Sequence, residues 1–315
     1  MSSATAPVAG SEATVISKSE ALRLAGVSAQ VALALLVMWA FRLESRTFFG
    51  VALIAGVGFL PHALLPKTWR LSAFVLLSFA SLVYVVGTLN SLWLIGAGVL
   101  LVGVCHLPIK LIWRAALLLG IAALIAASRM GKLPAPWGAG VWAVFGAVFM
   151  FRVALYLHAV AFEPVRPTPM QAAAYFLMLP NPVFPLFPVV DFNTFVRTHY
   201  STPAIETYQT GVAWIARGTM HLLLYRVVYQ NLPGDPFRLT KLSEFLWYLL
   251  GTFLLYLRVS GQFHVIVGML HLFGFGLPET HKLFLLSSSF TDFWRRINIY
   301  WKDFMMKLVY YPSFF

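Results

Sequence analysis

Long apolar runs separated by short polar breaks fill most of the chain. A helix that crosses the hydrocarbon of a bilayer needs about 20 mostly apolar residues. Runs near this length predict spanning helices over residues 22–41, 48–66, 71–89, 91–109, 111–128, 137–160, 207–230, 243–258 and 262–276. The last two runs are short. Arg258, Ser260 and Gly261 interrupt the apolar pattern near their boundary, so the two runs can also form one bent helix. The pattern predicts an all-α, polytopic integral membrane bundle with at least eight embedded helical elements.

A segment with a different pattern lies between residues 163 and 203. It is rich in Phe, Val and Leu, yet prolines interrupt it repeatedly: Pro164, Pro167, Pro169, Pro180, Pro182, Pro185, Pro188 and Pro203. A solvated linker would be polar. Irregular backbone at membrane depth is tolerated only where protein buries it or where it lines a cavity. We therefore expect a re-entrant or broken helix over 171–192, irregular near 180–190 and packed inside protein. A surface loop lying on the interface is the alternative.

The stretch 289–311 is amphipathic instead of spanning. Ser289, followed three residues later by Asp292, is a helix-start signal. An apolar stripe continues at helical spacing through Phe293, Ile297, Trp301, Met305 and Leu308. Basic side chains lie off that stripe, at Arg295, Arg296, Lys302 and Lys307. The pattern predicts a C-terminal amphipathic helix that lies in the membrane interface.

Composition and charge agree with a membrane protein. The 315-residue chain is 60% hydrophobic and 11% charged, against roughly 25% charged residues in soluble domains. The basic residues behind its net charge of +12 sit mostly between apolar runs, where they flank helices and contact anionic lipid headgroups. We therefore expect membrane lipid as a partner and no nucleic acid. With Cys105 as its single cysteine, the chain cannot form an intrachain disulfide.

Three regions follow from these patterns. Residues 1–20 are polar and rich in Ala, Ser and Thr, which predicts a disordered N-terminus without a cleaved signal peptide. Residues 21–160 hold the N-terminal transmembrane helices, and residues 161–315 hold the remaining core. Basic residues around the first spans favour a cytoplasmic N-terminus.

Ionisable side chains inside predicted spans are costly and are functional candidates by default. Arg217 and His221 are four residues apart and share one helix face. His264 and His271 are seven apart, and Gly268 between them would let another backbone or a substrate approach closely. We expect Arg217, His221 and His264 to point into the bundle, each toward a polar partner or into a water-filled cavity. A purely structural polar seam is the alternative. Helical metal sites prefer His at i and i+4 with a carboxylate nearby, so no metal site is expected.

Two stretches near the end resemble the membrane-bound O-acyltransferase family. Phe273-Gly-Phe-Gly-Leu-Pro-Glu-Thr280 is similar to the GF.LPENF stretch of bacterial members, and the run from Ser289 to Lys302 is similar to their S..DFWRRWH.SLS.W.RDY. Residues 292–296 match directly, whereas Ile297 stands where Trp is common. Asn298, flanked by Trp294 and Trp301, falls at a position that is His or Asn in the family. The resemblance is specific over 261–312 and loose over 171–260.

This resemblance implies transfer of an acyl group, above all acetyl, from a thioester to a hydroxyl. The donor would be acyl-CoA or an acyl carrier protein, the acceptor a polysaccharide or a similar molecule, and no other cofactor is expected. It also implies a bacterial inner (cytoplasmic) membrane protein with an extracytoplasmic partner acyltransferase. Asn298 would be the catalytic residue and would position the hydroxyl or the thioester carbonyl. The substrate or tunnel candidates are Asp292, Trp294, Arg295, Arg296, Trp301, His264, His271, Arg217 and His221.

The family's general base is a His on a later apolar helix, and none of His264, His271 or His281 stands at its position. We therefore expect a truncated acyltransferase-like core over 161–315, inactive alone, from a longer enzyme or a naturally short relative. Two rival functions remain. The polar face at Arg217 and the broken 171–192 segment would also suit a transporter or flippase-like permease, and the chain can equally be a non-catalytic membrane subunit.

Overall fold

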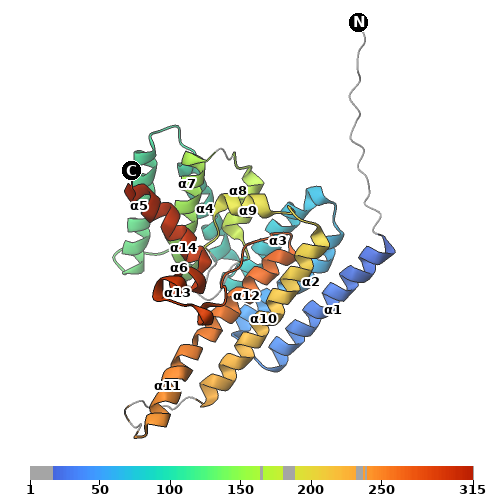
Figure 1. The fold of residues 1–315 in the computed structure, drawn as a ribbon. Coiled ribbons are helices and arrows are strands. Elements are labelled where there is room, and N and C mark those ends of the chain that lie inside the picture. The colour runs from blue at the N-terminus through green and yellow to red at the C-terminus, as the bar shows by residue number, and fades with distance from the viewer. Residues whose placement is uncertain (1–16, 164–165, 180–188, 232–236, 238–239, 315) are drawn as a thin grey trace.

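The computed structural model describes residues 17–163, 166–179, 189–231, 237 and 240–314, which form a bundle of helices (Figure 1). Within these ranges the only β pairing is an isolated bridge between His199 and Phe275. The all-α polytopic architecture predicted from the apolar runs is therefore confirmed. Residues 1–16 of the predicted disordered N-terminus lie outside the described residues.

The first five helices follow the first five apolar runs, and each boundary falls within four residues of its predicted place. They are α1 (Lys18–Ala40), α2 (Arg46–Leu64), α3 (Lys67–Val86), α4 (Thr88–Cys105) and α5 (Leu111–Arg129). Ser17 and Glu20 form a capping box that starts α1 at Lys18. Gly87 alone separates α3 from α4, and its φ of +83° is a conformation open to glycine.

Within the residues that the structure describes, six helices are long and apolar enough to cross a membrane: α1 to α5 and the joined pair α11–α12 over Leu242–Leu272. The chain is therefore an integral membrane protein. A further long helix, α10 (Ala204–Asn231), is more polar because it carries Arg217, His221 and Arg226. The expectation of at least eight embedded elements stays a prediction beyond these six.

The sixth apolar run is not one helix. It divides into α6 (Val141–Ala147), a π-helix η1 (Val148–Arg152) and α7 (Val153–Phe162). The π-helix ends at Arg152, which is buried and donates hydrogen bonds to the carbonyl oxygens of Phe176, 2.5 Å away, and Met178, 3.4 Å away. Single π-turns inside α-helices are rare and frequently mark functional or strained places. Here the π-helix ends at Arg152, whose buried guanidinium binds backbone carbonyl oxygens at the end of a later helix.

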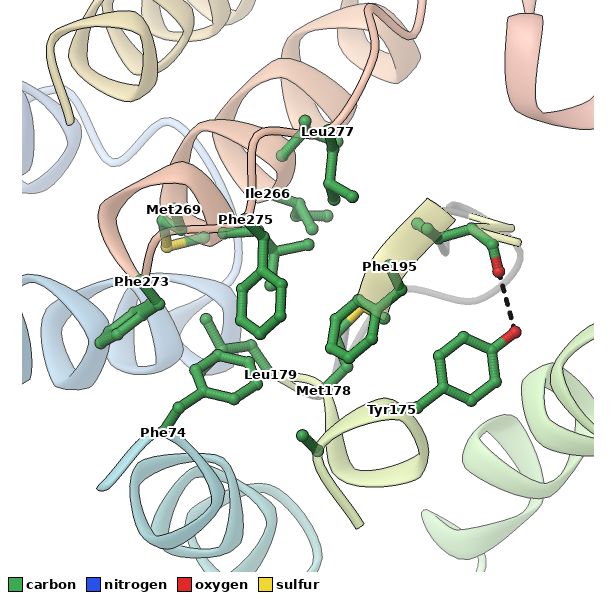
Figure 2. Close-up of a cluster of buried hydrophobic side chains, with 14 of the residues drawn as sticks. Phe74, Tyr175, Met178, Leu179, Phe195, Ile266, Met269, Phe273, Phe275 and Leu277 are labelled. Carbon is green, nitrogen blue, oxygen red and sulfur yellow. Dashed lines mark hydrogen bonds between the residues drawn. The ribbon is translucent and has the colours of Figure 1, made fainter. Parts of the chain in front are cut away.

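The Pro-rich segment forms two short helices, α8 (Pro169–Leu177) and α9 (Phe192–Thr198). Figure 2 shows Tyr175 and Phe195 in the apolar core, with the Tyr175 hydroxyl donating to the Val190 carbonyl at 2.8 Å. Phe195 also stacks on Phe275, which follows α12, with ring centroids 4.3 Å apart. Residues 180–188 lie outside the described part, and the two helices that flank them are packed inside protein. The re-entrant placement of this segment stays a prediction.

Helix α10 packs directly along α12 (Tyr256–Leu272), and α1 covers the other side of α10 (Figure 1). Gly211 faces Gly268 and Gly218 faces Gly261: a Cβ added to Gly211 or Gly218 would lie 2.7 or 2.6 Å from the facing carbonyl oxygen. Small residues at helix crossings permit such close backbone approach in membranes. The close approach predicted at Gly268 is thus confirmed.

The break before α12 lies at Leu255, after α11 (Leu242–Leu254), and not at residues 258–261 as predicted. Arg258 lies inside α12 and forms an ion pair with Glu44, 3.0 Å away, in the connection between α1 and α2. Ser260 and Gly261 are buried and contact α10. Small and polar residues here serve helix packing instead of ending the helix.

The C-terminal amphipathic helix predicted over 289–311 is not continuous. It divides into α13 (Phe290–Ile297), α14 (Ile299–Met305), a π-helix η4 (Met306–Tyr310) and a 3₁₀ turn η5 (Tyr311–Phe314). Ser289 caps α13 by accepting a hydrogen bond from Asp292 N, as predicted. Asn298 then adopts an extended conformation, with φ −154° and ψ 92°. The apolar stripe is therefore divided among α13, α14 and η4.

Candidate functional site

A groove of about 1350 Å³ runs beside the C-terminal helices and α7. Its walls include Trp294 and Arg295 from α13, Trp301 and Lys302 from α14, and Lys307 from η4. The groove therefore combines three cations with two indole rings. Three of these residues, Trp294, Arg295 and Trp301, are candidates named from the sequence.

Short helices at the end of the chain hold these side chains in place. The Ser289 cap fixes the start of α13, so that Trp294 and Arg295 lie exposed on its outer side. Trp301 is held by aromatic packing: its ring lies edge-on to Phe151 at 5.5 Å and stacks on Phe304 at 5.3 Å. The π-helix η1, which contains Phe151, thus supports one wall of the groove.

Asn298 has a structural role at the join between α13 and α14. Its amide oxygen accepts a hydrogen bond from Trp301 N, 3.0 Å away, and so caps α14. Asn298 is half-buried and does not line the groove. The side-chain NH₂ makes no hydrogen bond within the described residues, so its two donors remain for a ligand.

Asp292 and Arg296 pair with each other and also do not line the groove. Arg296 Nε donates to Asp292 Oδ1 at 2.8 Å, one helical turn away. This hydrogen bond lowers the pKa of Asp292 below its ordinary value. Both residues therefore stabilise α13, and the structure does not bring them to the groove as substrate contacts.

A cluster of charged residues surrounds Lys307, which lines the groove. Lys307 Nζ lies 2.5 Å from Asp191 Oδ1 and also contacts Glu163. His158 Nδ1 lies 3.6 Å from the same Glu163 carboxylate. Burial alone would lower the pKa of Lys307, but the hydrogen bonds to Asp191 and Glu163 outweigh it and raise that pKa.

Sequence reasoning missed this cluster except for Lys307. Its members come from α7, its C-cap, the N-cap of α9 and η4, so they are far apart in the chain. Only Asp191 gave a local signal, since an Asp directly before a helix suits an N-cap, and it does accept from Thr194 N at 3.1 Å.

The histidines named from the sequence form a separate row between α10 and α12, in which His264 and His271 are buried and His221 is half-buried. His221 Nδ1 lies 2.9 Å from Ser260 Oγ, and His264 Nδ1 donates to the Ser260 carbonyl at 2.6 Å. The rings of His264 and His281 stack, with centroids 5.5 Å apart. Burial, with smaller contributions from His264 and His221, lowers the pKa of His281 to about 3, so this loop histidine is neutral at ordinary pH.

The prediction that polar residues of α10 and α12 face the interior holds for His221 and His264. It is wrong for Arg217, which is exposed and lies over the face of Trp214, with its guanidinium carbon 5.9 Å from the ring centroid. An exposed guanidinium stays solvated or reaches lipid headgroups. Either position has a lower desolvation free energy than burial of the charge. His271 is buried and stacks on Trp214.

One side chain joins the histidine row to the Asn298 break. The Tyr256 hydroxyl lies 2.9 Å from both His281 Nε2 and the Ile297 carbonyl oxygen. The backbone of this loop also pairs with the break, because Ile299 N donates to the Thr280 carbonyl at 2.9 Å. Asn298 is therefore next to the histidine row in structure.

A second cavity, of about 300 Å³, lies among α3, α4, the α6–η1 segment and α8. Its lining is almost wholly apolar, and Arg152 is the only one of its lining residues that is ionisable. None of the candidates named from the sequence lines it. Among the described residues, no three His, Cys, Asp or Glu side chains come together as they would to hold a metal ion.

No family model, curated protein or solved structure matches the chain. The function must therefore be inferred from the groove, the charged cluster and the sequence motif.

Proposed function

We propose that the chain is a membrane-bound O-acyltransferase of the bacterial inner membrane. It would transfer an acyl group, above all acetyl, from acyl-CoA or an acyl carrier protein to a hydroxyl of a polysaccharide or similar acceptor. One observation carries the proposal: Trp294, Arg295 and Trp301 of the acyltransferase-like motif line one groove together with Lys302 and Lys307.

The chemistry of the groove suits a thioester on a phosphate-bearing carrier. A guanidinium binds phosphate through two parallel hydrogen bonds, and an ammonium binds it as a point charge. Indole faces offer stacking surfaces for a base or a sugar ring. Acyl transfer also needs donors for the negative charge that develops on the carbonyl oxygen. Arg295 and Lys302 can supply them from the groove wall, and the Asn298 amide can supply them beside it.

Donor binding tests this proposal without requiring turnover. The full chain in lipid nanodiscs should bind radiolabelled acetyl-CoA saturably. A hydrogen bond to a charged group contributes about 1.5–3 kcal/mol, so Arg295→Ala should weaken binding roughly 10- to 100-fold. Arg23→Ala, an exposed arginine on α1, should not change the dissociation constant.

Two results would count against the acyltransferase. Absence of saturable binding to both acetyl-CoA and an acetylated carrier protein would show that the groove is not a donor site. Equal affinity in Arg295→Ala and Arg23→Ala would place the donor elsewhere. Solute uptake by proteoliposomes without donor binding would favour the permease instead.

A further inference from the structure

The apolar cavity among α3, α4, the α6–η1 segment and α8 has the size and lining of a ligand site. Its volume is about 300 Å³, and every lining residue except Arg152 is apolar. Ligand sites range from about 300 to 1,000 Å³ and are mostly apolar with a few placed polar groups. An apolar cavity does not hold water but takes up apolar ligands. This cavity therefore suits an apolar ligand with one polar end.

The lining of the cavity follows two helices along their length. On α4 it extends from Leu94 to Val102, and on α8 from Pro169 to Leu177. Along α8 this distance is about 13 Å at the helical rise of about 1.5 Å per residue. An engineered apolar cavity of about 150 Å³, half the present volume, takes up the six carbons of benzene. An alkyl chain of about twelve carbons therefore suits both the volume and the elongated lining.

Arg152 supplies the one charge in this lining. The residue is 4% exposed, and its guanidinium donates to the carbonyl oxygens of Phe176 and Met178 at the end of α8. Both acceptors are neutral, so these hydrogen bonds hold the guanidinium without cancelling its charge. A cation inside a membrane is stabilised by an anion, and a guanidinium pairs with a carboxylate through two parallel hydrogen bonds. The polar end of the ligand should therefore be a carboxylate.

The cavity reaches the lipid-facing surface of the bundle. Val99 lines it from α4, a helix able to cross a membrane, and is 68% exposed. A ligand can therefore enter from the bilayer. A fatty acid can make this passage with its carboxyl group protonated, because neutralisation avoids the cost of burying an unpaired charge. A phospholipid would have to move an ionised phosphate past the same apolar wall.

We propose that this cavity binds a medium-chain fatty acid of about twelve carbons, with its carboxylate on Arg152 and its chain between α4 and α8. The inference goes beyond the proposed acyltransferase and does not depend on it, since none of the residues that line the cavity lines the groove. None of the motif residues Asp292 to Asn298 lines the cavity either.

The π-helix η1 contacts both the cavity and the groove. Val148 and Arg152 line the cavity, whereas Phe151 lies edge-on to Trp301 of the groove wall, with ring centroids 5.5 Å apart. A ligand that fills the cavity contacts η1 and stabilises it against local opening. Amide exchange over residues 148–152 should therefore slow when the fatty acid binds.

The experiment uses the full chain in lipid nanodiscs with a photoreactive dodecanoic acid that carries a diazirine at the end of its chain. Mass spectrometry locates the cross-linked residues, which should lie on the helices that line the cavity. Unlabelled dodecanoate and methyl dodecanoate then compete with the probe. The ester has the same chain without the charge, and a hydrogen bond to a charged group is the stronger kind. Dodecanoate should therefore compete roughly 10- to 100-fold better than the ester.

Two variants test the space and the charge separately. Gly98 lines the cavity, and a Cβ added to it meets nothing within 4 Å. Gly98→Leu should therefore fill the cavity without a clash and abolish the specific labelling. Gly103→Leu is the matched control on α4, because Gly103 has the same open space but does not line the cavity. Arg152→Gln keeps an amide donor for the α8 carbonyls, and should weaken dodecanoate roughly 10- to 100-fold but leave methyl dodecanoate unchanged.

Each outcome supports or overturns the proposal. Equal competition by dodecanoate and its methyl ester overturns the pairing with Arg152, as does wild-type affinity in Arg152→Gln. Wild-type labelling of Gly98→Leu overturns the cavity as the site. A phospholipid with the same photoreactive chain that labels these helices, undiminished by dodecanoate, would show a bilayer lipid in the cavity and overturn the fatty acid. If Arg152→Gln does not fold, the ester comparison and Gly98→Leu still decide.

Discussion

The hydroxyl of Tyr256 donates a hydrogen bond to the backbone carbonyl of Ile297, 2.9 Å away. The same oxygen lies 2.9 Å from His281 Nε2. A hydroxyl has a single proton to donate, so His281 must donate its own Nε2–H to Tyr256. One side chain of α12 therefore fixes a histidine tautomer and holds the helix break at Asn298.

Tyr256→Phe should loosen this join. The substitution leaves the Ile297 carbonyl and the His281 N–H without their partner, and an unsatisfied buried group costs about 1–3 kcal/mol. We expect a lower thermal unfolding midpoint in detergent and faster amide exchange over residues 290–305. Tyr229→Phe is the control, because that side chain is 61% exposed. Identical exchange in the two variants would show that Tyr256 does not hold the break.

Asn298 variants should separate capping from ligand contact. Asn298→Ala removes the side-chain cap of α14 and should lower the free energy of unfolding by about 0.5–2 kcal/mol. Asn298→Asp keeps a capping oxygen but loses both amide donors. It should remain as stable as wild type yet bind acetyl-CoA more weakly. Wild-type binding by Asn298→Asp would remove Asn298 from the proposed site.

The helices could be predicted from the sequence because each is encoded locally. A run of about 20 apolar residues is long enough to span a bilayer. The start of α13 is encoded by Ser289, whose side chain accepts a hydrogen bond from the backbone three residues later. The close approach at Gly268 was also predictable, since glycine lacks the Cβ that would block it.

The helix break and the charged cluster depend on distant residues and could not be predicted in this way. The apolar stripe through Ile297 and Trp301 is compatible with one helix. The break between them is held by Tyr256 and Thr280 from a separate segment. Likewise, Glu163 meets Lys307 only after the chain has folded. A single sequence contains no local signal for such long-range pairs.

Gly218→Ala should disrupt the packing of α10 against α12. The new Cβ would lie 2.6 Å from the Gly261 carbonyl oxygen and 2.8 Å from Val265 Cγ2, and backbone cannot yield as a flexible side chain does. Overpacking of this kind costs about 1–3 kcal/mol. Gly120→Ala on α5 is the matched control, because nothing lies within 4 Å of its added Cβ. Equal thermal unfolding midpoints for the two variants would contradict the close crossing.

Lys307→Met should destabilise the join between α7, α9 and η4, because it leaves the carboxylates of Glu163 and Asp191 together without their cation. We expect a loss of about 1–3 kcal/mol, less than for a fully buried pair because these side chains are partly exposed. Lys302→Met is the control. Its partner Asp303 is 54% exposed, so that pair contributes little.

The loss of stability in Lys307→Met should depend on pH. The ion pairs raise the folded-state pKa of Lys307 above its ordinary value of 10.5. Its contribution is therefore complete below about pH 10.5 and is lost only as the pH rises through the folded-state pKa. The difference in unfolding free energy between wild type and Lys307→Met should stay constant from pH 7 to about pH 10 and shrink above that. A difference that already shrinks between pH 8 and pH 9 would mean that Lys307 titrates below its ordinary range, as a buried lysine without strong ion pairs does. Denaturant unfolding at each pH, followed by tryptophan fluorescence, measures the difference directly, because Trp301 lies beside η4 in the same groove wall.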